Sequence, residues 1–332
     1  MQSPVRASSS SSRKFVWLGT AIVAGCLLWT LGWFLFAAQI EDRLPESLAR
    51  ITGPNASADC TAADVRGYPF RFGLFCDTLS YTNVSDGVSA SAGALRSAAQ
   101  FYRPGHAVAE IDGPLAIVSP NLTLRADWQS LQSSIRSLAD GLDRGSIDSR
   151  NVSFNIDGEG LGQRLALQLD RVTAHARRNG TDLDIATYGE NLRNNAVPGL
   201  TAKSVTLEAT LSGQAGLLQV PYTAPQGAFE AVLHSLAVAL DDSASLSVSG
   251  PVQIDDAGQI SGDLEVTVRN QQRFMDLMAN FDPDAARLLG QIAPLISTLD
   301  IQPDNEGVTL PLTIRSNKIS LGIFPLGRIP AF

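Results

Sequence analysis

Residues 204–211 read Ser-Val-Thr-Leu-Glu-Ala-Thr-Leu, in which an apolar residue follows each polar one. Because successive side chains of a strand point to opposite faces, this pattern predicts a strand with one apolar and one polar face. The same alternation recurs at residues 152–156, 165–169, 264–268 and 308–314. Turn-forming pairs such as Asp157-Gly158 and Asn179-Gly180 separate such runs. The sequence therefore predicts a long antiparallel sheet with one apolar and one solvated face.

Helical spacing is confined to a few segments. Residues 127–142 carry apolar side chains three and four positions apart, at Trp128, Leu131, Ile135, Leu138 and Leu142. Residues 270–299 form the longest candidate helix, which Pro283 divides, and residues 186–193 form a weaker one. The predicted fold class is α+β and β-rich, a long antiparallel curved sheet covered by two or three helices. A boundary inside this β-rich region is placed near residues 197–225, at either residues 197–199 or residues 214–225, both of which are rich in Gly, Pro and Gln.

The N-terminal part contains an unbroken apolar run, Phe15 to Ala38. As a helix this run would be roughly 36 Å long, enough to cross a hydrocarbon core of about 30 Å. All basic residues before position 40 precede the run (Arg6, Arg13 and Lys14), so the positive-inside rule places residues 1–14 in the cytoplasm. Residues 15–38 are then a single transmembrane helix after this tail, and residues 39–332 a periplasmic β-rich region. Residues 41–51 are expected to form a short amphipathic helix directly after it. The expected location is the bacterial inner membrane.

Two other interpretations of this run stay open. A cleavable signal peptide usually has a shorter apolar core and a small-residue cleavage site, for which Ala37-Ala38 is the candidate. Val23-Ala24-Gly25-Cys26 resembles a lipobox, in which Cys26 would be lipidated. A lipoprotein normally continues with a polar tether, whereas apolar residues follow Cys26 here. We therefore favour an uncleaved anchor.

The charge balance limits the partners. The chain has 25 Lys and Arg against 33 Asp and Glu, and three of the basic residues precede the apolar run, so the exported part is strongly acidic. An acidic surface repels phosphate, which makes nucleic acid a poor partner. The membrane, contacted through residues 15–38, is the partner that the sequence predicts directly.

Outside the apolar run the cysteines are an even pair, Cys60 and Cys76. They flank residues 65–72, which read as strand, turn and strand, with Gly67 and Pro69 in the turn. Folding this segment into a hairpin would bring the two cysteines close together, and an oxidising compartment favours a disulfide. A redox or metal site is the competing interpretation, but no CxxC motif or nearby histidine supports it.

The sequence shows no motif for catalysis, cofactor binding or metal binding. His106, His175 and His234 are far apart, and His234 is expected on the apolar face of a strand. The acidic pairs Asp241-Asp242 and Asp255-Asp256 abut turns, where aspartate is common for backbone reasons. We therefore expect no catalytic, cofactor or metal residues, no cofactor and no enzymatic activity.

Two stretches resemble known families. Gly67-Tyr68-Pro69-Phe70-Arg71 with downstream Cys76, together with Leu310-Pro311-Leu312, Ile319-x-Leu321-Gly322 and Phe324-Pro325-Leu326, resembles an uncharacterised bacterial envelope family of unknown function. That resemblance implies one N-terminal membrane helix and a large periplasmic β-rich region. Residues 248–269 are also similar to AsmA-like envelope proteins, which implies a link to outer-membrane assembly and lipid movement. In the hairpin motif we expect Phe70 to be buried and Arg71 to pair with a carboxylate or a lipid phosphate.

The functional expectation follows from these features. A membrane-anchored periplasmic protein with one-sided strands is expected to bind phospholipid or another acyl-chain ligand through the apolar face of its sheet. The alternative is a scaffold or interaction module in envelope assembly that uses sheet edges. An exported hydrolase with scattered catalytic residues is the least favoured class. The ligand and the protein partners are not identified by the sequence.

Overall fold

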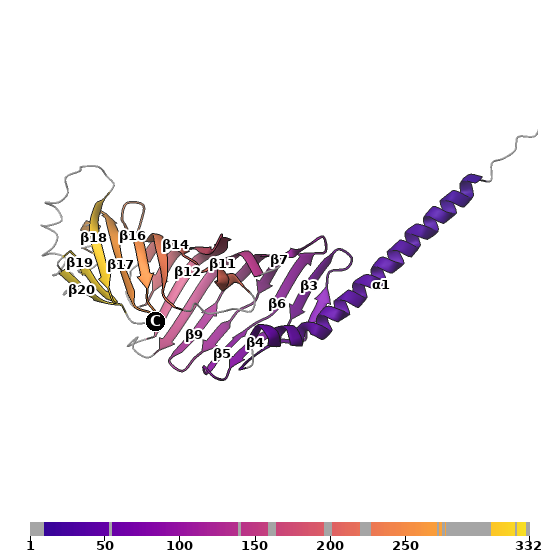
Figure 1. Ribbon diagram of the computed structural model, residues 1–332, viewed down its shortest axis with the longest axis horizontal. Helices are drawn as coiled ribbons and strands as arrows, with labels where there is room; N and C mark the ends of the chain where they lie inside the picture. Colours follow the sequence, from indigo (N-terminus) through magenta and orange to yellow (C-terminus); the bar gives the residue numbers. More distant parts are fainter. Residues whose placement is uncertain are drawn as a thin grey trace, which may run out of the picture.

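A computed structural model describes residues 10–52, 55–138, 141–158, 164–195, 201–219, 227–270, 272–273, 276, 307–322 and 324–329. Within these residues the chain forms one long helix, α1 (Ser10–Thr52), followed by an antiparallel sheet of 20 strands (Figure 1). Helix α1 has the length and composition of a membrane-spanning segment or a signal sequence over Arg13–Arg50. It continues to Thr52, so residues 41–51 extend α1 and are not a separate helix.

The strands are as follows in chain order: β1 (Ala56–Thr61), β2 (Asp64–Arg66), β3 (Arg71–Cys76), β4 (Thr78–Asn83), β5 (Val88–Ala92), β6 (Leu95–Gln100), β7 (Arg103–Ile111), β8 (Leu115–Val118), β9 (Leu122–Asp127), β10 (Ser130–Leu138), β11 (Gly141–Gly158), β12 (Leu165–Asn179), β13 (Asp182–Asn194), β14 (Thr201–Leu211), β15 (Phe229–Ala239), β16 (Ser245–Ile254), β17 (Ile260–Arg269), β18 (Val308–Arg315), β19 (Lys318–Leu321) and β20 (Phe324–Arg328). A short 3₁₀ helix, η1 (Ala215–Leu218), follows β14 and contacts β11, β12 and β13.

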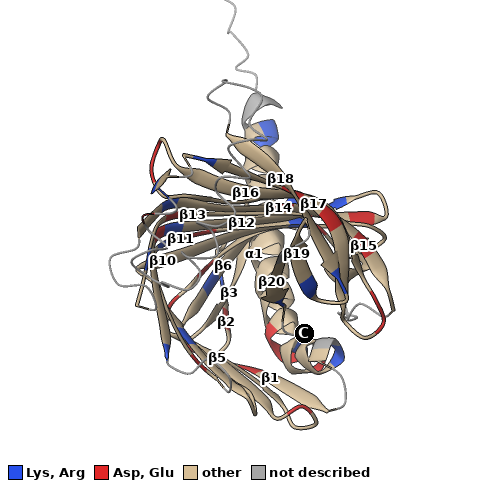
Figure 2. Cartoon of the chain, turned by 90° about the vertical axis from the view of Figure 1, so that its left-hand side faces the viewer, with Lys and Arg blue, Asp and Glu red and all other residues tan. Residues whose placement is uncertain are grey.

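Strand β11 joins three parts of the sheet. Its first half pairs with β10 and its second half with β9, while β12 pairs with it along the other side. From β11 to β20 the strands pair in chain order as a meander. Before β11 the sheet has two branches, one through β2, β3, β6, β7 and β10 and the other through β1, β4, β5, β8 and β9. The sheet curves rather than lying flat, as the view along its long axis shows (Figure 2).

Two predicted helices are strands in the structure. Residues 127–142 form the end of β9, all of β10 and the start of β11, and residues 186–193 lie in β13. The reason is that residues four apart share a face in a strand as well as in a helix, so Leu131 and Ile135 satisfy both patterns. The serines at 130, 133, 134 and 137 are weak helix formers, and pairing with β7 and β11 decides the outcome.

The prediction of two or three helices covering the sheet is not met within the described residues. After α1, these residues contain the four-residue η1 and isolated helical positions at 272, 273 and 276. The remainder of the predicted helix at 270–299 lies outside the described residues. The described part of the molecule is therefore a large antiparallel sheet without a helical layer over it.

Strands β11 and β13, which both pair with β12, each contain an extra residue that keeps one face apolar along the strand. In β11 both Arg150 and Asn151 are exposed, and Asn151 has a positive φ of 49°. In β13 both Glu190 and Asn191 are exposed, and Asn191 has a φ of 52°. Two consecutive exposed residues shift the alternation by one, as a β-bulge does. Apolar residues on both sides of Asn151, such as Ile147 and Phe154, consequently lie on the same face.

Candidate functional site

The C-terminal half of α1 packs against the hairpin made by β2 and β3. Trp33 and Ala37 on the helix and Val65 on β2 are buried together, with Phe72 and Leu74 of β3 packed against them. Burial of this kind contributes about 25 cal/mol for each Å² of apolar surface removed from water. The helix is thus joined to the first strands of the sheet by a hydrophobic core.

Hydrogen bonds from the helix fix the turn of this hairpin. The indole N–H of Trp29 donates to the carbonyl oxygen of Pro69 at 3.1 Å, and that of Trp33 donates to the carbonyl oxygen of Arg71 at 3.1 Å. The hydroxyls of Thr30 and Tyr68 lie 2.7 Å apart. Buried or membrane-facing indoles need such an acceptor, so the two tryptophans have partners that hold the helix in one position against the hairpin.

Aromatic rings surround this contact. The Trp33 ring stacks on Phe72, with centroids 5.2 Å apart and planes at 7°. Tyr68 stacks on Phe34 at 5.8 Å, and Trp29 meets Phe101 edge-to-face at 4.7 Å. Such pairs add about 0.5–1.5 kcal/mol each beyond their buried area.

The motif residues differ in part from their predicted roles. Phe70 is 64% exposed, so the prediction that its ring is buried is wrong, and Phe72 is the ring that packs on the helix. Phe70 precedes β3 and lies in the turn, so it is outside the core that α1 forms with β2 and β3. Among the described residues no carboxylate forms an ion pair with Arg71. The tight turn needs Gly67, because a Cβ there would lie 2.8 Å from the Arg71 carbonyl oxygen.

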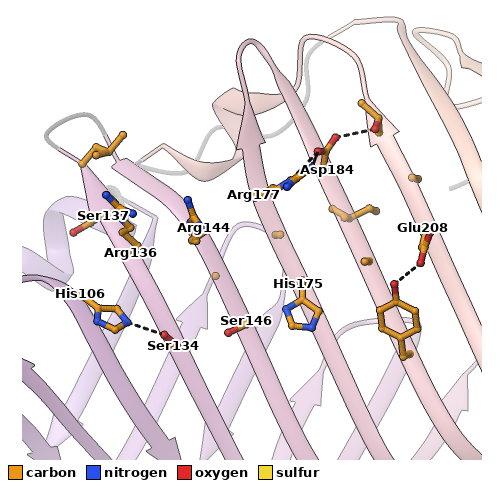
Figure 3. Close-up of a pocket in the computed structure, with 18 of the residues that line it drawn as sticks. His106, Ser134, Arg136, Ser137, Arg144, Ser146, His175, Arg177, Asp184 and Glu208 are labelled. Carbon is orange, nitrogen blue, oxygen red and sulfur yellow. Dashed lines mark hydrogen bonds and ion pairs between the residues drawn. The ribbon is translucent and has the colours of Figure 1, made fainter.

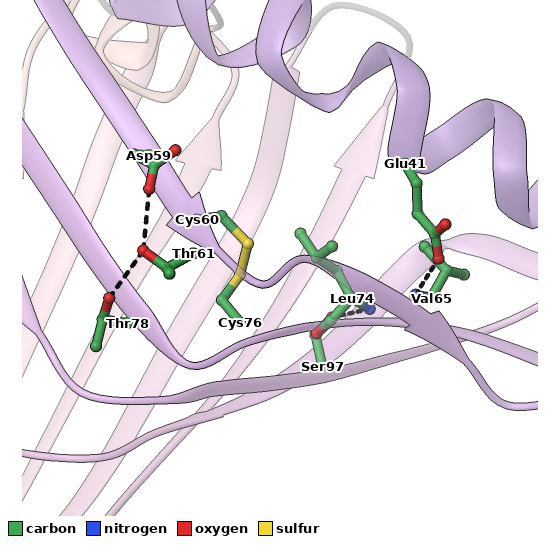
Figure 4. The surroundings of a disulfide bond; sticks show 9 residues. All are labelled: Glu41, Asp59, Cys60, Thr61, Val65, Leu74, Cys76, Thr78 and Ser97. Atoms are coloured by element: carbon green, nitrogen blue, oxygen red, sulfur yellow. Dashed lines mark hydrogen bonds between the residues drawn. A yellow bond between two sulfur atoms is a disulfide. The ribbon is translucent and has the colours of Figure 1, made fainter.

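The predicted disulfide between Cys60 and Cys76 is present, with the two Cα atoms 5.3 Å apart (Figure 4). It joins β1 to β3 and thereby ties together the two branches of the sheet, whose last strands, β9 and β10, both pair with β11. Nearby, the Glu41 carboxylate of α1 accepts a hydrogen bond from the Val65 backbone N–H at 2.6 Å. A covalent link, a helix contact and a charge-assisted hydrogen bond therefore meet within a few residues.

The face of the sheet on which α1 packs is apolar. Cross-strand pairs on this face include Ile147 with Ala174, Thr187 with Leu207, and Leu207 with Leu236. Large apolar side chains here keep much of their surface in contact with solvent: Ile135 is 40% exposed, Ile147 42% and Leu236 41%. A sealed core would leave such side chains a few per cent exposed. We name this open part, on β10 to β15, the apolar strip.

The apolar strip lies between two buried regions. At one end Trp33 and Val65 are 5% and 7% exposed. At the other end, on β17 and β18, Leu264 is 5% exposed and Ile314 5%. Between these ends burial varies along the same face: Val152 of β11 is 3% exposed and Leu183 of β13 5%, whereas Ile135, Ile147 and Leu236 stay open. Across the strands Phe72 pairs with Ala99, Ala99 with Ala107, and Ala107 with Ile135, so the strip is continuous with the region where the helix joins the sheet.

The opposite face holds an open polar groove whose lining includes all three histidines of the chain, of which His106 and His175 are labelled in Figure 3. The groove has a volume of about 1300 Å³ and crosses β7 and β10 to β15. His106 hydrogen-bonds Ser134 at 3.1 Å, and His234 hydrogen-bonds Thr210 at 2.9 Å. The expectation that His234 lies on an apolar face is wrong, because a bulge between β14 and β15 moves it to the exposed face.

Charged groups in this groove are paired across strands. Arg177 forms an ion pair with Asp184 at 2.9 Å, and the Thr210 hydroxyl together with Arg177 holds the pKa of the Asp184 carboxyl below its usual range. The hydrogen bond from Tyr188 to Glu208 raises the pKa of the Tyr188 phenol. Exposed pairs of this kind stabilise the strands only modestly, because solvent screens them.

The two acidic pairs lie at turns, as predicted. The Asp241 carboxylate accepts from the backbone N–H groups of Ser243 and Ala244 at 2.8 and 2.9 Å. The Asp255 carboxylate accepts from Ala257 and Gln259 in the same manner. Within the described ranges no group of three or more His, Cys, Asp or Glu could hold a metal ion.

The junction of α1 with the β2–β3 hairpin was not predicted, and neither was the placement of all three histidines along one groove. The junction joins residues almost 40 positions apart, and no local pattern signals it. To predict that the histidines share a face, one would need to know the pairing register of every strand from β7 to β15. The apolar face follows from the alternation of the strands, but the alternation does not say that part of this face stays open.

A protein-family model described as "Uncharacterized protein conserved in bacteria (DUF2125)" matches residues 33–330 of the chain. No curated protein and no solved structure matches the chain.

Proposed function

The chain belongs to this family of uncharacterised bacterial proteins, and we propose that it is a membrane-anchored periplasmic protein that holds phospholipid acyl chains on the apolar strip. The observation that carries the proposal is the half-exposure of Ile135, Ile147 and Leu236, on β10, β11 and β15, on a face whose other apolar side chains include buried ones such as Leu183 and Leu264. An exposed patch of this kind on a soluble domain marks a binding surface for an apolar partner.

The junction with α1 favours an uncleaved anchor. Cleavage after Ala38 would remove Trp33 and Ala37, which are each 5% exposed, from their contact with Val65 and Phe72. The sheet would then expose a second apolar surface where the helix had been. An anchor that keeps these contacts holds the start of the sheet beside the membrane.

The disulfide supports the periplasmic side of that membrane. Disulfides persist in oxidising compartments, and the one between Cys60 and Cys76 lies just after the helix. With Arg13 and Lys14 before the apolar run, the same orientation follows from the charges.

Acyl chains fit the strip better than a folded partner does. The strip has aliphatic side chains, and its strand backbones are paired with neighbours on both sides from β11 to β15, so it offers few hydrogen-bonding groups. It also continues to the point where α1 enters the sheet, which gives a lipid an apolar route from the membrane. The resemblance of residues 248–269 to AsmA-like proteins is a sequence argument for the same class. We assign no catalytic residue, because the carboxylates that line the polar groove, Asp184 and Glu208, are bonded to neighbouring side chains of the sheet.

Site-specific photo-crosslinking in cells tests the proposal. A photoreactive amino acid at Ile147 lies in the apolar strip, and the same amino acid at Ser146 lies on the polar face as a matched control. After growth with radioactive phosphate we expect a labelled lipid adduct at position 147 and none at position 146. A discrete protein adduct at 147 without lipid would instead support an assembly scaffold. Equal labelling at both positions, or none, would contradict the proposal.

A further inference from the structure

We propose that the tip of the β2–β3 hairpin and the neighbouring turn between β6 and β7 are immersed in the periplasmic interface of the membrane. We name these residues, Tyr68, Pro69, Phe70, Phe101 and Tyr102, the aromatic tip. The proposal rests on the membrane-anchor role proposed above for α1 and not on the lipid-binding role of the apolar strip.

The helix sets the depth of the aromatic tip. A hydrocarbon core of about 30 Å takes roughly 20 helical residues, so a span that starts at Phe15, after Arg13 and Lys14, reaches its far edge near Phe34. Trp29 and Thr30 are the helix residues that hydrogen-bond Pro69 and Tyr68. They precede Phe34 by four or five positions, or roughly 7 Å along the helix. Because the tip touches the helix there, it lies at or just below the edge of the core.

The side chains of the tip suit that depth. Four aromatic residues project from two adjacent turns and remain largely uncovered: Tyr68 is 48% exposed, Phe70 64%, Phe101 46% and Tyr102 64%. Tyrosine is enriched at membrane interfaces, where its ring can be apolar and its hydroxyl hydrated. Tyr68 and Phe101 contact α1 on one side only, so in water the rest of the cluster would be an exposed apolar patch.

The backbone carbonyl groups of the turn are also hydrogen-bonded within the protein, as a site with little water requires. Four carbonyl oxygens of the turn have donors: Gly67 accepts from Arg71 N–H at 2.9 Å, Phe70 from Phe101 N–H at 3.1 Å, and Pro69 and Arg71 from the two indoles. Irregular backbone at membrane depth is tolerated only where its polar groups have such partners.

Two arginines lie directly beside the aromatic residues. Arg71 and Arg103 both pair in register with Gln100, on the strands either side of β6, and both are exposed. Guanidinium groups bind phosphate through charge-assisted hydrogen bonds. The aromatic residues would lie at the level of the acyl chains. The arginines, one residue farther from the bilayer centre, would lie at the level of the phospholipid headgroups.

Depth-dependent quenching in reconstituted full-length protein tests this placement. In a Cys26→Ser background, Phe70→Cys, Tyr102→Cys and Val84→Cys are labelled with an environment-sensitive fluorophore. Val84 is the matched control, because it is 81% exposed and its N–H bonds Asn55, beyond the end of α1. The vesicles contain phosphatidylglycerol and phosphatidylcholine, with a nitroxide at carbon 5 of the acyl chain.

We expect the nitroxide lipid to quench the labels at 70 and 102 several-fold more than the label at 84, and aqueous iodide to show the reverse order. Equal quenching at all three positions would overturn the proposal. Non-reducing mass analysis that shows Cys60 and Cys76 still bonded to each other verifies that each variant is folded. Crosslinking of lipid at Ile147 is a separate result, so either proposal can fail while the other stands.

Discussion

The indole of Trp33 donates a hydrogen bond to the carbonyl oxygen of Arg71 at 3.1 Å while its ring lies on the neighbouring Phe72. One side chain on the helix thus contacts two consecutive residues of β3. This relationship makes the end of a membrane-type helix part of the core of the sheet. The contact links α1 to the β-rich region.

Trp33→Ala should weaken that link substantially. Large-to-small substitution of a buried Trp costs about 3–5 kcal/mol, and Trp33 is 5% exposed. We expect a clearly lower thermal midpoint for the full-length protein in detergent. Trp17→Ala is the matched control, because Trp17 is on the same helix but 76% exposed. Equal midpoints for the two variants would show that α1 does not pack on the sheet in solution.

Removal of the disulfide should destabilise the start of the sheet. Cys60 and Cys76 close a loop with a sequence separation of 16, for which the chain-entropy estimate is about 3 kcal/mol. The double variant Cys60→Ala/Cys76→Ala should unfold at a lower urea concentration, and a reductant should no longer change its midpoint. Cys26→Ser should leave the midpoint unchanged. A double variant as stable as the parent would contradict a structural role.

The sheet and the disulfide could be predicted because their signals are local. Alternation of apolar and polar residues needs only a few neighbours, and Cys60 and Cys76 flank a recognisable turn. The predicted helix at 127–142 failed for a local reason too, since the spacing of Leu131 and Ile135 fits both structures. Trp33 shows the other limit. In the sequence it is one apolar residue of a membrane run, and only the fold shows that it packs on β3.

The open apolar strip also depended on information that the sequence does not contain. Strands with one apolar face predict either a sealed core or an exposed surface, and the covering elements decide between them. In the structure Ile147 is 42% exposed and Leu236 41%, whereas Leu264 is 5% exposed. That contrast along one face defines the candidate site.

Acid should destabilise the β-rich region through its cross-strand ion pairs. Hydrogen bonds from Arg96 lower the pKa of the Asp112 carboxyl, with contacts of 2.5 and 2.8 Å. A group whose pKa is lower in the folded state adds stability above its unfolded pKa of about 3.9. That stability is lost as the pH falls through the lower folded value. Urea unfolding from pH 7 to pH 3 should show this loss.

The Asp112→Asn variant isolates the pair. Because both side chains are about half exposed, we expect a loss of less than about 1 kcal/mol at pH 7 and a shallower dependence of the unfolding free energy on pH below 4. Asp256→Asn, at an exposed turn, is the control and should leave the profile unchanged. An Asp112→Asn profile identical to the parent's would show that the pair does not form in solution.

A charge in the apolar strip should abolish lipid binding. Ile147→Asp would place a carboxylate among acyl chains, which costs about 2.5–3.5 kcal/mol by analogy with a membrane interior, or roughly a 100-fold loss of affinity. Ser146→Asp adds the same charge on the opposite face and should keep the bound lipid. Lipid extracted from each purified variant and measured by mass spectrometry is the readout. Equal lipid content in the two variants would remove the apolar strip from the binding site.

The last prediction concerns Asn151, whose backbone shifts the alternation of β11. Its φ of 49° lies in the left-handed region, which costs most residues about 1–2 kcal/mol and a β-branched residue more. Asn151→Val should therefore lower the urea midpoint, whereas Asn151→Gly should be tolerated. Asn155→Val, at an exposed position later in β11, controls for the loss of a polar side chain.

The consequence of Asn151→Val for binding is larger than its effect on stability. If the substituted position adopts ordinary strand geometry, the residues on one side of it turn over, and Ile147 and Phe154 no longer share a face. Residual folded protein should then bind less lipid than Asn151→Gly at equal folded fraction. A variant that is destabilised but binds lipid normally per folded molecule would show that a continuous apolar face across β11 is not required. Binding that falls with the loss of the positive φ would instead identify the bulge as the feature that keeps the apolar strip continuous.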